Sequence, residues 1–265
     1  MKNLLLLEWN KIKYPVLAVL FFCTVLSIYL CSTVYKNYSL EEQLEAWEVG
    51  TTVFNILFPL IAVIPTGWLL YYEKKNDFLS YTLPRASKKQ YLFAKWIVMS
   101  SSAFTIVFTI FFVGALVTLF INDPIVVMYK KMDPLTEITF PSVELDHFLG
   151  STFVHQPLLY ATLLSFWKGI LASLIATMGF LLSLFIQNLF IILTGPFVYL
   201  MVENYVLQVL NFRSYRFFLS FDPTMDSATD ITSFSLVVGP VIVLLLMVLF
   251  FLYMRYVKKV TIYKV

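Results

Sequence analysis

The sequence is short of charge: only 13% of its 265 residues are charged, whereas 60% are hydrophobic and 18% are aromatic. A soluble domain carries about a quarter charged residues, so this chain has roughly half the polar surface that it would need in water. The net charge of +3 identifies no partner, because the distribution of charge matters more than its sum. The composition excludes a soluble enzyme, a disordered chain and a nucleic-acid-binding protein.

Several motifs of catalysis and metal binding are also missing. None of the eight glycines is followed by lysine, so the phosphate-binding P-loop is absent. The two histidines, His147 and His155, are eight residues apart, and we interpret them as solvated loop residues. Cys23 and Cys31 are also eight residues apart, about 12 Å along one helix and too far for a disulfide. We therefore expect a chain that is not an enzyme, with no catalytic residue, metal or cofactor of its own.

Long apolar runs are what the sequence does have. Residues 158–212 contain only two charges, Lys168 and Glu203, and would form a single helix about 82 Å long. A bilayer core is about 30 Å thick, and Gln187-Asn188 is the polar point that divides this run. The sequence predicts an all-α integral membrane protein with six spans. These spans are 14–35, 51–72, 96–121, 158–186, 189–212 and 233–257.

Basic residues indicate the orientation of the spans. With a cytoplasmic N-terminus, 13 of the 19 lysines and arginines lie on the inner side and five on the outer side. Acidic residues show the opposite bias, with three inside and 12 outside. Because inner segments are enriched in lysine and arginine, we predict that both termini are cytoplasmic.

The segments outside the spans are short. Residues 1–13 have the composition of an amphipathic helix at the inner interface, and the alternative is an extension of the first span. Residues 14–257 form the transmembrane domain, and residues 258–265 form a cytoplasmic tail. The largest outer segment is 122–157, while residues 213–232 include phenylalanines that would dip into the interface. We predict one membrane domain without a soluble catalytic domain.

Lys168 and Glu203 are candidate functional residues because a charge within a span costs roughly 2.5–3.5 kcal/mol on insertion scales. Counted from the 187–188 hairpin, their depths differ by about 6 Å, which a lysine side chain can bridge. We predict a buried ion pair. The alternatives are contact with a polar substrate group and snorkelling of the charges to the headgroups. Beside Lys168, four small residues form a stripe suited to close helix packing: Gly169, Ser173, Ala176 and Gly179.

The inner segment 73–95 resembles that of type-2 ABC exporter permeases. In that class an acidic residue ends the second span, a short coupling helix follows, and a lysine opens the third span. The matching residues are Glu73, Leu79, Leu83, Pro84, Arg85, Ser87 and Lys95. The six spans, the amphipathic start and the inner hairpin match as well, so the resemblance extends over the whole chain.

The resemblance implies the permease subunit of an exporter, of the branch that exports antimicrobial peptides or confers immunity to them. Two copies of a cytoplasmic ATPase, which binds ATP and Mg²⁺, would drive it, and a second permease, identical or homologous, would complete the pathway. The implied ATPase-coupling residues are Asp77, Phe78, Leu79, Tyr81, Leu83, Pro84 and Arg85. The cargo would be a peptide, a lipid or a drug, hydrophobic or cationic and amphipathic, leaving a bacterial cytoplasmic membrane. The alternative is a secondary transporter or channel that needs no ATPase.

Overall fold

The computed structural model describes residues 2–76, 87–125, 143–225 and 232–258, and these residues contain helices and no strands. Among them, six helices are long and apolar enough to cross a membrane. They are α1 (Lys2–Thr33), α2 (Glu45–Lys75), α4 (Lys88–Phe120), α7 (Pro157–Phe185), α8 (Leu189–Val209) and α10 (Ser233–Leu252), which the π-helix η5 (Tyr253–Val257) extends. The chain is therefore a multi-pass membrane protein.

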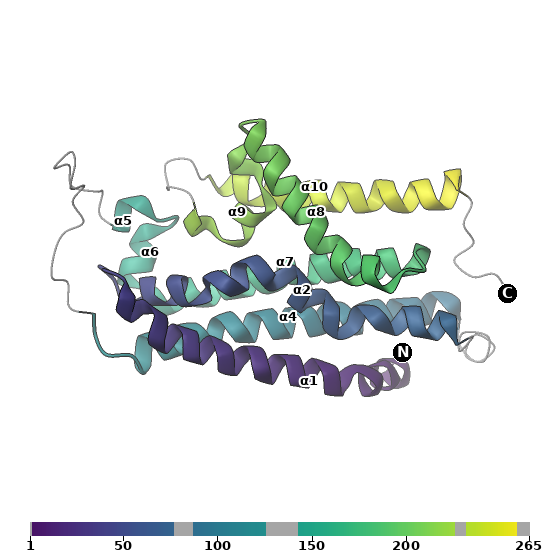
Figure 1. Ribbon diagram of the computed structural model, residues 1–265, viewed down its shortest axis with the longest axis horizontal. Coiled ribbons are helices and arrows are strands. Elements are labelled where there is room, and N and C mark those ends of the chain that lie inside the picture. Colours follow the sequence, from purple (N-terminus) through teal and green to yellow (C-terminus); the bar gives the residue numbers. More distant parts are fainter. Residues whose placement is uncertain (1, 77–86, 126–142, 226–231, 259–265) are drawn as a thin grey trace.

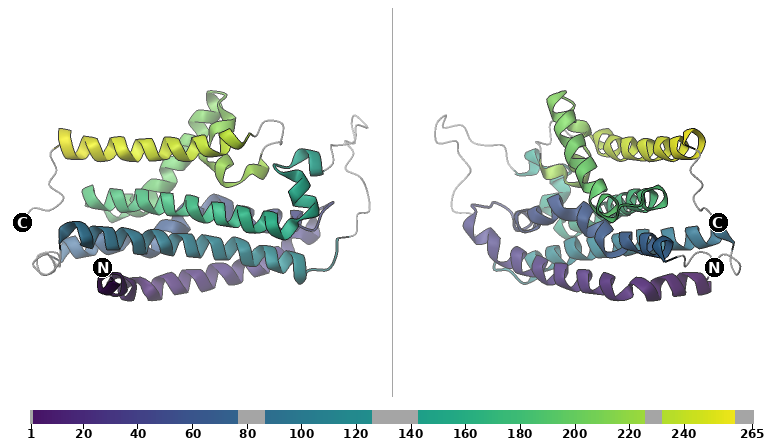
Figure 2. Two further views of the ribbon diagram at one scale, coloured as in Figure 1. Left: turned by 180° about the vertical axis from the view of Figure 1, so that it is seen from behind. Right: turned by 45° about the vertical axis from the view of Figure 1, so that its right-hand side comes forward.

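The long helices run up and down, so that α1 begins and η5 ends at the same end of the bundle (Figure 1). We call this the terminus end and the opposite one the loop end. Between 50% and 61% of the residues in the apolar stretches of α2, α4 and α7 are buried, against 22% in those of α1, α8 and α10. The helices α2, α4 and α7 thus form the centre, and α8 and α10 lie on one side of it (Figure 2).

Short helices occupy the loop end. They are η1 (Val34–Asn37), α5 (Val143–Asp146), α6 (Gly150–His155), η2 (Arg213–Tyr215), α9 (Phe217–Phe221) and η3 (Pro223–Met225). All five residues of α9 are buried. The phenylalanines expected at the interface therefore belong to a helix that enters the bundle.

Each predicted span falls on one of the six helices, and the hairpin at Gln187-Asn188 is confirmed between α7 and α8. The Asn188 side chain accepts a hydrogen bond from the backbone N–H of Phe190 at 2.9 Å, which caps the start of α8. The first three helices are longer than predicted, since the charged residues at their ends are paired inside the bundle rather than solvated. The helix α1 thus includes residues 2–13, which were predicted as an interfacial helix or an extension of the first span, while α2 and α4 extend into the predicted inner segment 73–95.

Two helices change direction. The helix α1 is continuous through the predicted boundary at residue 13, although its first turns run at an angle to the rest (Figure 2). It contains Pro15, and α8, which bends away from the bundle in Figure 1, contains Pro196. A proline removes one backbone hydrogen bond from a helix and commonly bends it.

The small-residue stripe of α7 packs against its neighbours as predicted. A Cβ atom on Gly169 would lie 2.9 Å from the ring of Phe104 in α4, and one on Gly179 would lie 2.7 Å from the side chain of Val63 in α2. The Ser173 hydroxyl donates to the backbone oxygen of Ser100 at 2.9 Å. Small side chains thus bring α7 close to both central helices.

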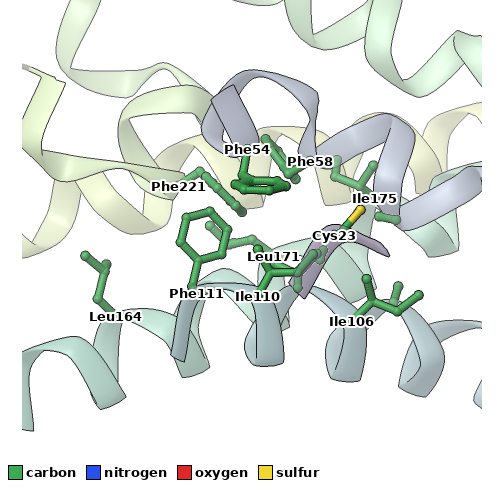
Figure 3. Packing of buried hydrophobic residues seen from close by; sticks show 14 of the residues in the cluster. Cys23, Phe54, Phe58, Ile106, Ile110, Phe111, Leu164, Leu171, Ile175 and Phe221 are labelled. Atoms are coloured by element: carbon green, nitrogen blue, oxygen red, sulfur yellow. The ribbon is translucent and has the colours of Figure 1, made fainter. Parts of the chain in front are cut away.

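The core is built from apolar side chains of the six long helices and of α5, α6 and α9, and Figure 3 shows part of it. Phe221 of α9 stacks on Phe58 of α2, with ring centroids 3.7 Å apart, and meets Phe111 of α4 edge-on at 5.7 Å. Cys23 and Cys31 are buried free thiols, in agreement with the prediction that no disulfide joins them. The core therefore continues to the loop end, where α9 closes it.

Candidate functional sites

A closed network of four charged side chains lies at the terminus end. Lys11 Nζ lies 2.6 Å from Glu8 Oε1 and 2.8 Å from Glu73 Oε1. Lys95 Nζ lies 2.5 Å from Glu8 Oε2 and 2.8 Å from Glu73 Oε2. Each lysine thus bridges both carboxylates, and the two positive charges balance the two negative ones. We call these four residues the terminus-end network.

The terminus-end network is buried and joins three helices. The side chains of Glu8 and Lys95 have no exposed surface, and Lys11 is 23% exposed. The Tyr91 hydroxyl donates to Glu73 Oε2 at 2.6 Å. Removal of one ion from such a group leaves an uncompensated buried charge, which is strongly unfavourable. The network therefore holds α1, α2 and α4 together.

Lys74 extends this arrangement to a fourth helix. Its ammonium group donates to the backbone oxygens of Ser183 and Leu184 at 2.7 and 2.6 Å. These carbonyls belong to the last turn of α7, where they lack intrahelical partners. The end of α2 is thus fixed to α7 as well as to α1 and α4.

In the sequence, the predicted coupling residues lie between Glu73 and Lys95 of this network. The segment from Asp77 to Arg85 is outside the described residues, while its flanks are described. Glu73 lies in the last turn of α2, and Ser87 caps α4 by accepting a hydrogen bond from the Gln90 backbone N–H. Glu73 and Lys95 are in direct contact. In the sequence they are linked only as two of the residues that resemble the permease pattern.

A second buried polar group, the loop-end cluster, surrounds Lys168. Lys168 is 1% exposed, and its ammonium group donates to Asn55 Oδ1 at 2.9 Å. Asp222 Oδ1 lies 3.7 Å from the same nitrogen, and the other oxygen of Asp222 accepts from the Asn55 amide. Thr224 also donates to Asp222, at 2.8 Å. Lys168, Asn55, Asp222 and Thr224 form this cluster, which joins α7, α2 and the segment after α9.

Aromatic rings enclose the Lys168 ammonium group. The ring centroids of Phe111, Phe221 and Trp47 lie 4.2, 5.2 and 5.5 Å from Nζ. The indole N–H of Trp47 donates to the backbone oxygen of Phe111 at 2.9 Å, which fixes one of these rings. The faces of aromatic rings attract cations, and the attraction increases where water is excluded. The rings therefore share the stabilisation of this charge with Asp222.

The predicted ion pair between Lys168 and Glu203 is wrong. No salt bridge joins them in the described part of the chain, where Lys168 meets Asn55 and Asp222 instead. The Glu203 carboxylate accepts from the backbone N–H of Phe217 at 3.1 and 3.3 Å, at the start of α9. The predicted depths assumed that α8 runs antiparallel to α7, but α8 bends away from the bundle (Figure 1), and it contains Pro196 before Glu203.

The two histidines also differ from each other. His155 is 68% exposed, as predicted. His147 is largely buried, with Nε2 3.1 Å from Glu48 Oε2 and its ring 4.5 Å from that of Phe153. The solvated-loop prediction is therefore wrong for His147, which fixes the segment after α5 to the start of α2.

Sequence reasoning missed most partners in both groups, although some signals were available. Glu8 and Lys11 have the (i, i+3) spacing of an ion pair on one helix face. Glu73 and Lys95 lie at adjacent ends of two antiparallel spans. Asp222, by contrast, follows a segment of four apolar residues and Ser220, and nothing in the sequence indicates that α9 turns it toward Lys168.

The described residues contain no group of three or more histidine, cysteine, aspartate and glutamate side chains placed to hold a metal ion. No family model, no curated protein and no solved structure matches the chain. Functional arguments therefore depend on the residues and their geometry.

Proposed function

We propose that this chain is the permease subunit of a type-2 ABC exporter in a bacterial cytoplasmic membrane, with the terminus end facing the cytoplasm. Its cargo would be a hydrophobic or cationic amphipathic molecule, with a peptide favoured over a lipid or a drug. The clustering of basic residues beside the terminus end supports this orientation. The acidic segment 36–50 at the loop end suits a cationic cargo.

The terminus-end network is the observation that carries the proposal. ATP-driven motion enters a permease through a cytoplasmic contact, and 77–86 is the segment that resembles a coupling helix. Glu73 before this segment and Lys95 after it are 2.8 Å apart, and they contact Lys11 and Glu8 of α1, respectively. A displacement of the segment would therefore move three helices together rather than one loop alone.

The proposal assigns ATP hydrolysis to a separate subunit, because the sequence has no P-loop. That subunit would bind ATP and Mg²⁺ in two copies, one for each permease of an identical or homologous pair. Within the segment, Phe78, Leu79 and Tyr81 would provide apolar contacts, and Arg85 would pair with an acidic group of the ATPase. Aromatic and arginine anchors commonly dominate interface energetics.

The test is to purify the full chain from its native host and to identify a co-purifying P-loop protein. Phe78→Ala and Arg85→Glu should each reduce ATPase association or transport by about tenfold while the permease still inserts. Lys89→Ala is the matched control, since this exposed lysine lies just outside the segment and should have little effect. Full transport and full ATPase association in both variants would contradict the proposal.

Orientation is tested separately by thiol labelling of intact cells. Cys23 and Cys31 are buried and provide a low background. A cysteine at Ser87 should resist an impermeant reagent, whereas a cysteine at Ser39 should react. Labelling of position 87 from outside would reverse the proposed orientation.

A secondary transporter is the second candidate, and the loop-end cluster is the observation that favours it. Buried ionisable groups within a membrane bundle commonly belong to ion or proton pathways. Lys168 and Asp222 are such groups, 3.7 Å apart and at the end of the bundle opposite to the proposed ATPase contact. Transport that collapses with the proton gradient, but persists without the ATPase, would favour this candidate.

A further inference from the structure

An apolar cavity of about 360 Å³ lies near the loop end, between α6, α7, η3 and α10. Such a volume is at the low end of the range for small-molecule sites, about 300–1,000 Å³. Along α7 its lining extends from Leu159 to Trp167, which is about 12 Å of helix. Leu236 and Val237 of α10 line the facing side. The cavity therefore follows α7 for about 12 Å.

The lining is mostly apolar, and the polar side chains in it are those of Thr152, Tyr160 and Trp167. Trp167 has one polar group, and its indole N–H already donates to the backbone oxygen of Ser220 at 2.8 Å. The Tyr160 ring packs edge-on against Phe153 with centroids 5.1 Å apart, and its hydroxyl oxygen is buried. A polar molecule would lose hydrogen bonds to water or to headgroups, and this lining would replace few of them. The cavity therefore favours a hydrocarbon.

Three residues that line the cavity are exposed on helices long and apolar enough to cross a membrane. Leu159, Leu163 and Val237 are 47%, 54% and 46% exposed, and they lie on two of the six candidate spans. The length of α7 along the cavity, about 12 Å, is slightly less than the thickness of one leaflet, which is half of a hydrocarbon core about 30 Å thick. An acyl chain of that leaflet lies in the same direction and reaches the cavity laterally.

We propose that this cavity binds one acyl chain of a membrane phospholipid from the leaflet at the loop end. The chain would fill the space between α7 and α10 and complete the packing of α10 against the bundle. Bulk lipid is as apolar as the cavity, so the preference arises from van der Waals contact with a fixed wall. The proposal does not depend on the exporter assignment, because the site needs neither the ATPase nor the cargo.

Photo-crosslinking of the full chain in phosphatidylcholine vesicles tests this site. A small fraction of the lipid carries a diazirine in the middle of one acyl chain, and labelled peptides are identified by mass spectrometry. Peptides with Leu159 and Leu163 should be labelled about fivefold more than the peptide with Phe21 and Phe22, which are exposed on α1 and report ordinary lipid contact. Equal labelling of both regions would overturn the proposal.

Two variants on α10 provide a matched comparison. Val237→Trp places a large ring in the cavity and should reduce the labelling of the α7 peptide to the level of α1. Leu246→Trp is the control, because Leu246 is similarly exposed but lines a different cavity, of about 220 Å³, between α7, α8 and α10. It should leave the labelling unchanged.

A third variant keeps the test independent of α10. Leu163→Trp fills the same cavity from α7 and should reduce labelling of the α10 peptide with Leu236 and Val237. Labelling that persists in both filled variants would overturn the proposal. Labelling that is confined to other faces of the bundle in the unmodified protein would also overturn the proposal. It would show that no acyl chain enters the cavity, whether the cavity is empty or filled by the polypeptide itself.

Discussion

The two buried polar groups both enclose a lysine completely, yet they stabilise it differently. In the terminus-end network, Lys95 lies within 2.8 Å of two carboxylates, and a second lysine balances the charge. In the loop-end cluster, Lys168 meets an amide oxygen at 2.9 Å, one carboxylate at 3.7 Å and three aromatic rings. The first group is a closed ionic ring, whereas the second depends on weaker and less directional contacts.

This difference indicates which end of the bundle can rearrange. A buried ion pair is favourable only with good geometry and further hydrogen bonds, and the terminus-end network has both. Near the loop-end cluster, the Glu48 Oε1, Tyr160 and Ser165 oxygens are buried and make no hydrogen bond within the described residues. Incompletely satisfied polar groups gain by changing partners. We therefore expect the terminus end to stay rigid while the loop end changes its contacts.

The largest expected effect comes from breaking the terminus-end network. Lys95→Met leaves Glu8 and Glu73 with one cation between them, and loss of one partner from a buried pair costs about 3–5 kcal/mol. The unfolding midpoint of the purified chain in one detergent measures the loss. Lys89→Met on the exposed surface of the same helix is the control.

The combination of Lys95→Met with Glu8→Gln should recover part of this loss, because it removes one positive and one negative charge together. A Lys95→Met protein as stable as the unmodified chain would contradict the network.

A smaller loss is expected for Lys168→Met. The three rings around the ammonium group remain and form favourable contacts with the methionine sulfur. We expect about 2–3 kcal/mol, less than for Lys95→Met, because Asp222 keeps its hydrogen bonds to Asn55 and Thr224. A loss larger than that of Lys95→Met, in the same detergent, would reverse the comparison.

Double-variant cycles separate the partners of Lys168. Lys168→Met and Asp222→Asn should be non-additive by at least about 0.5 kcal/mol, because the two side chains belong to one network. Lys168→Met and Glu203→Gln should be additive to within about 0.5 kcal/mol, since no salt bridge joins them in the described residues. Coupling in the second cycle but not in the first would restore the ion pair predicted from the sequence.

The sequence alone predicted the six helices, the 187–188 hairpin and the close packing of α7. These features depend on local properties, namely the length of apolar runs, a polar interruption and small side chains at helical spacing. It started the first and third spans at residues 14 and 96 and ended the second at residue 72, so Glu8, Glu73 and Lys95 were left outside the spans, whereas α1, α2 and α4 include them. Whether a charge near a span end is solvated or paired depends on which helices meet there, and that information is not local.

The same limit explains the error at Lys168. The sequence indicated that a charge at this depth needs a partner, and Asp222 meets that need. It indicated Glu203 because counting residues from the 187–188 hairpin treats α7 and α8 as straight antiparallel helices. Pro196 was visible as a site of bending, but the direction of the bend and the return of α9 into the bundle are tertiary features.

The smallest expected effect separates the two histidines at the loop end. His147→Ala removes the contact with Glu48 Oε2 and the packing on Phe153, and it leaves the largely buried Glu48 carboxylate without this partner. We expect a loss of about 1–2 kcal/mol in the free energy of unfolding. His155→Ala is the matched control, because its side chain is 68% exposed, and surface substitutions usually change stability by less than about 0.5 kcal/mol. His147→Gln should recover part of the loss, since its amide can donate to the same carboxylate. Equal effects of His147→Ala and His155→Ala would show that the segment after α5 is not fixed to α2, and the loop-end cluster would then be open to solvent on that side.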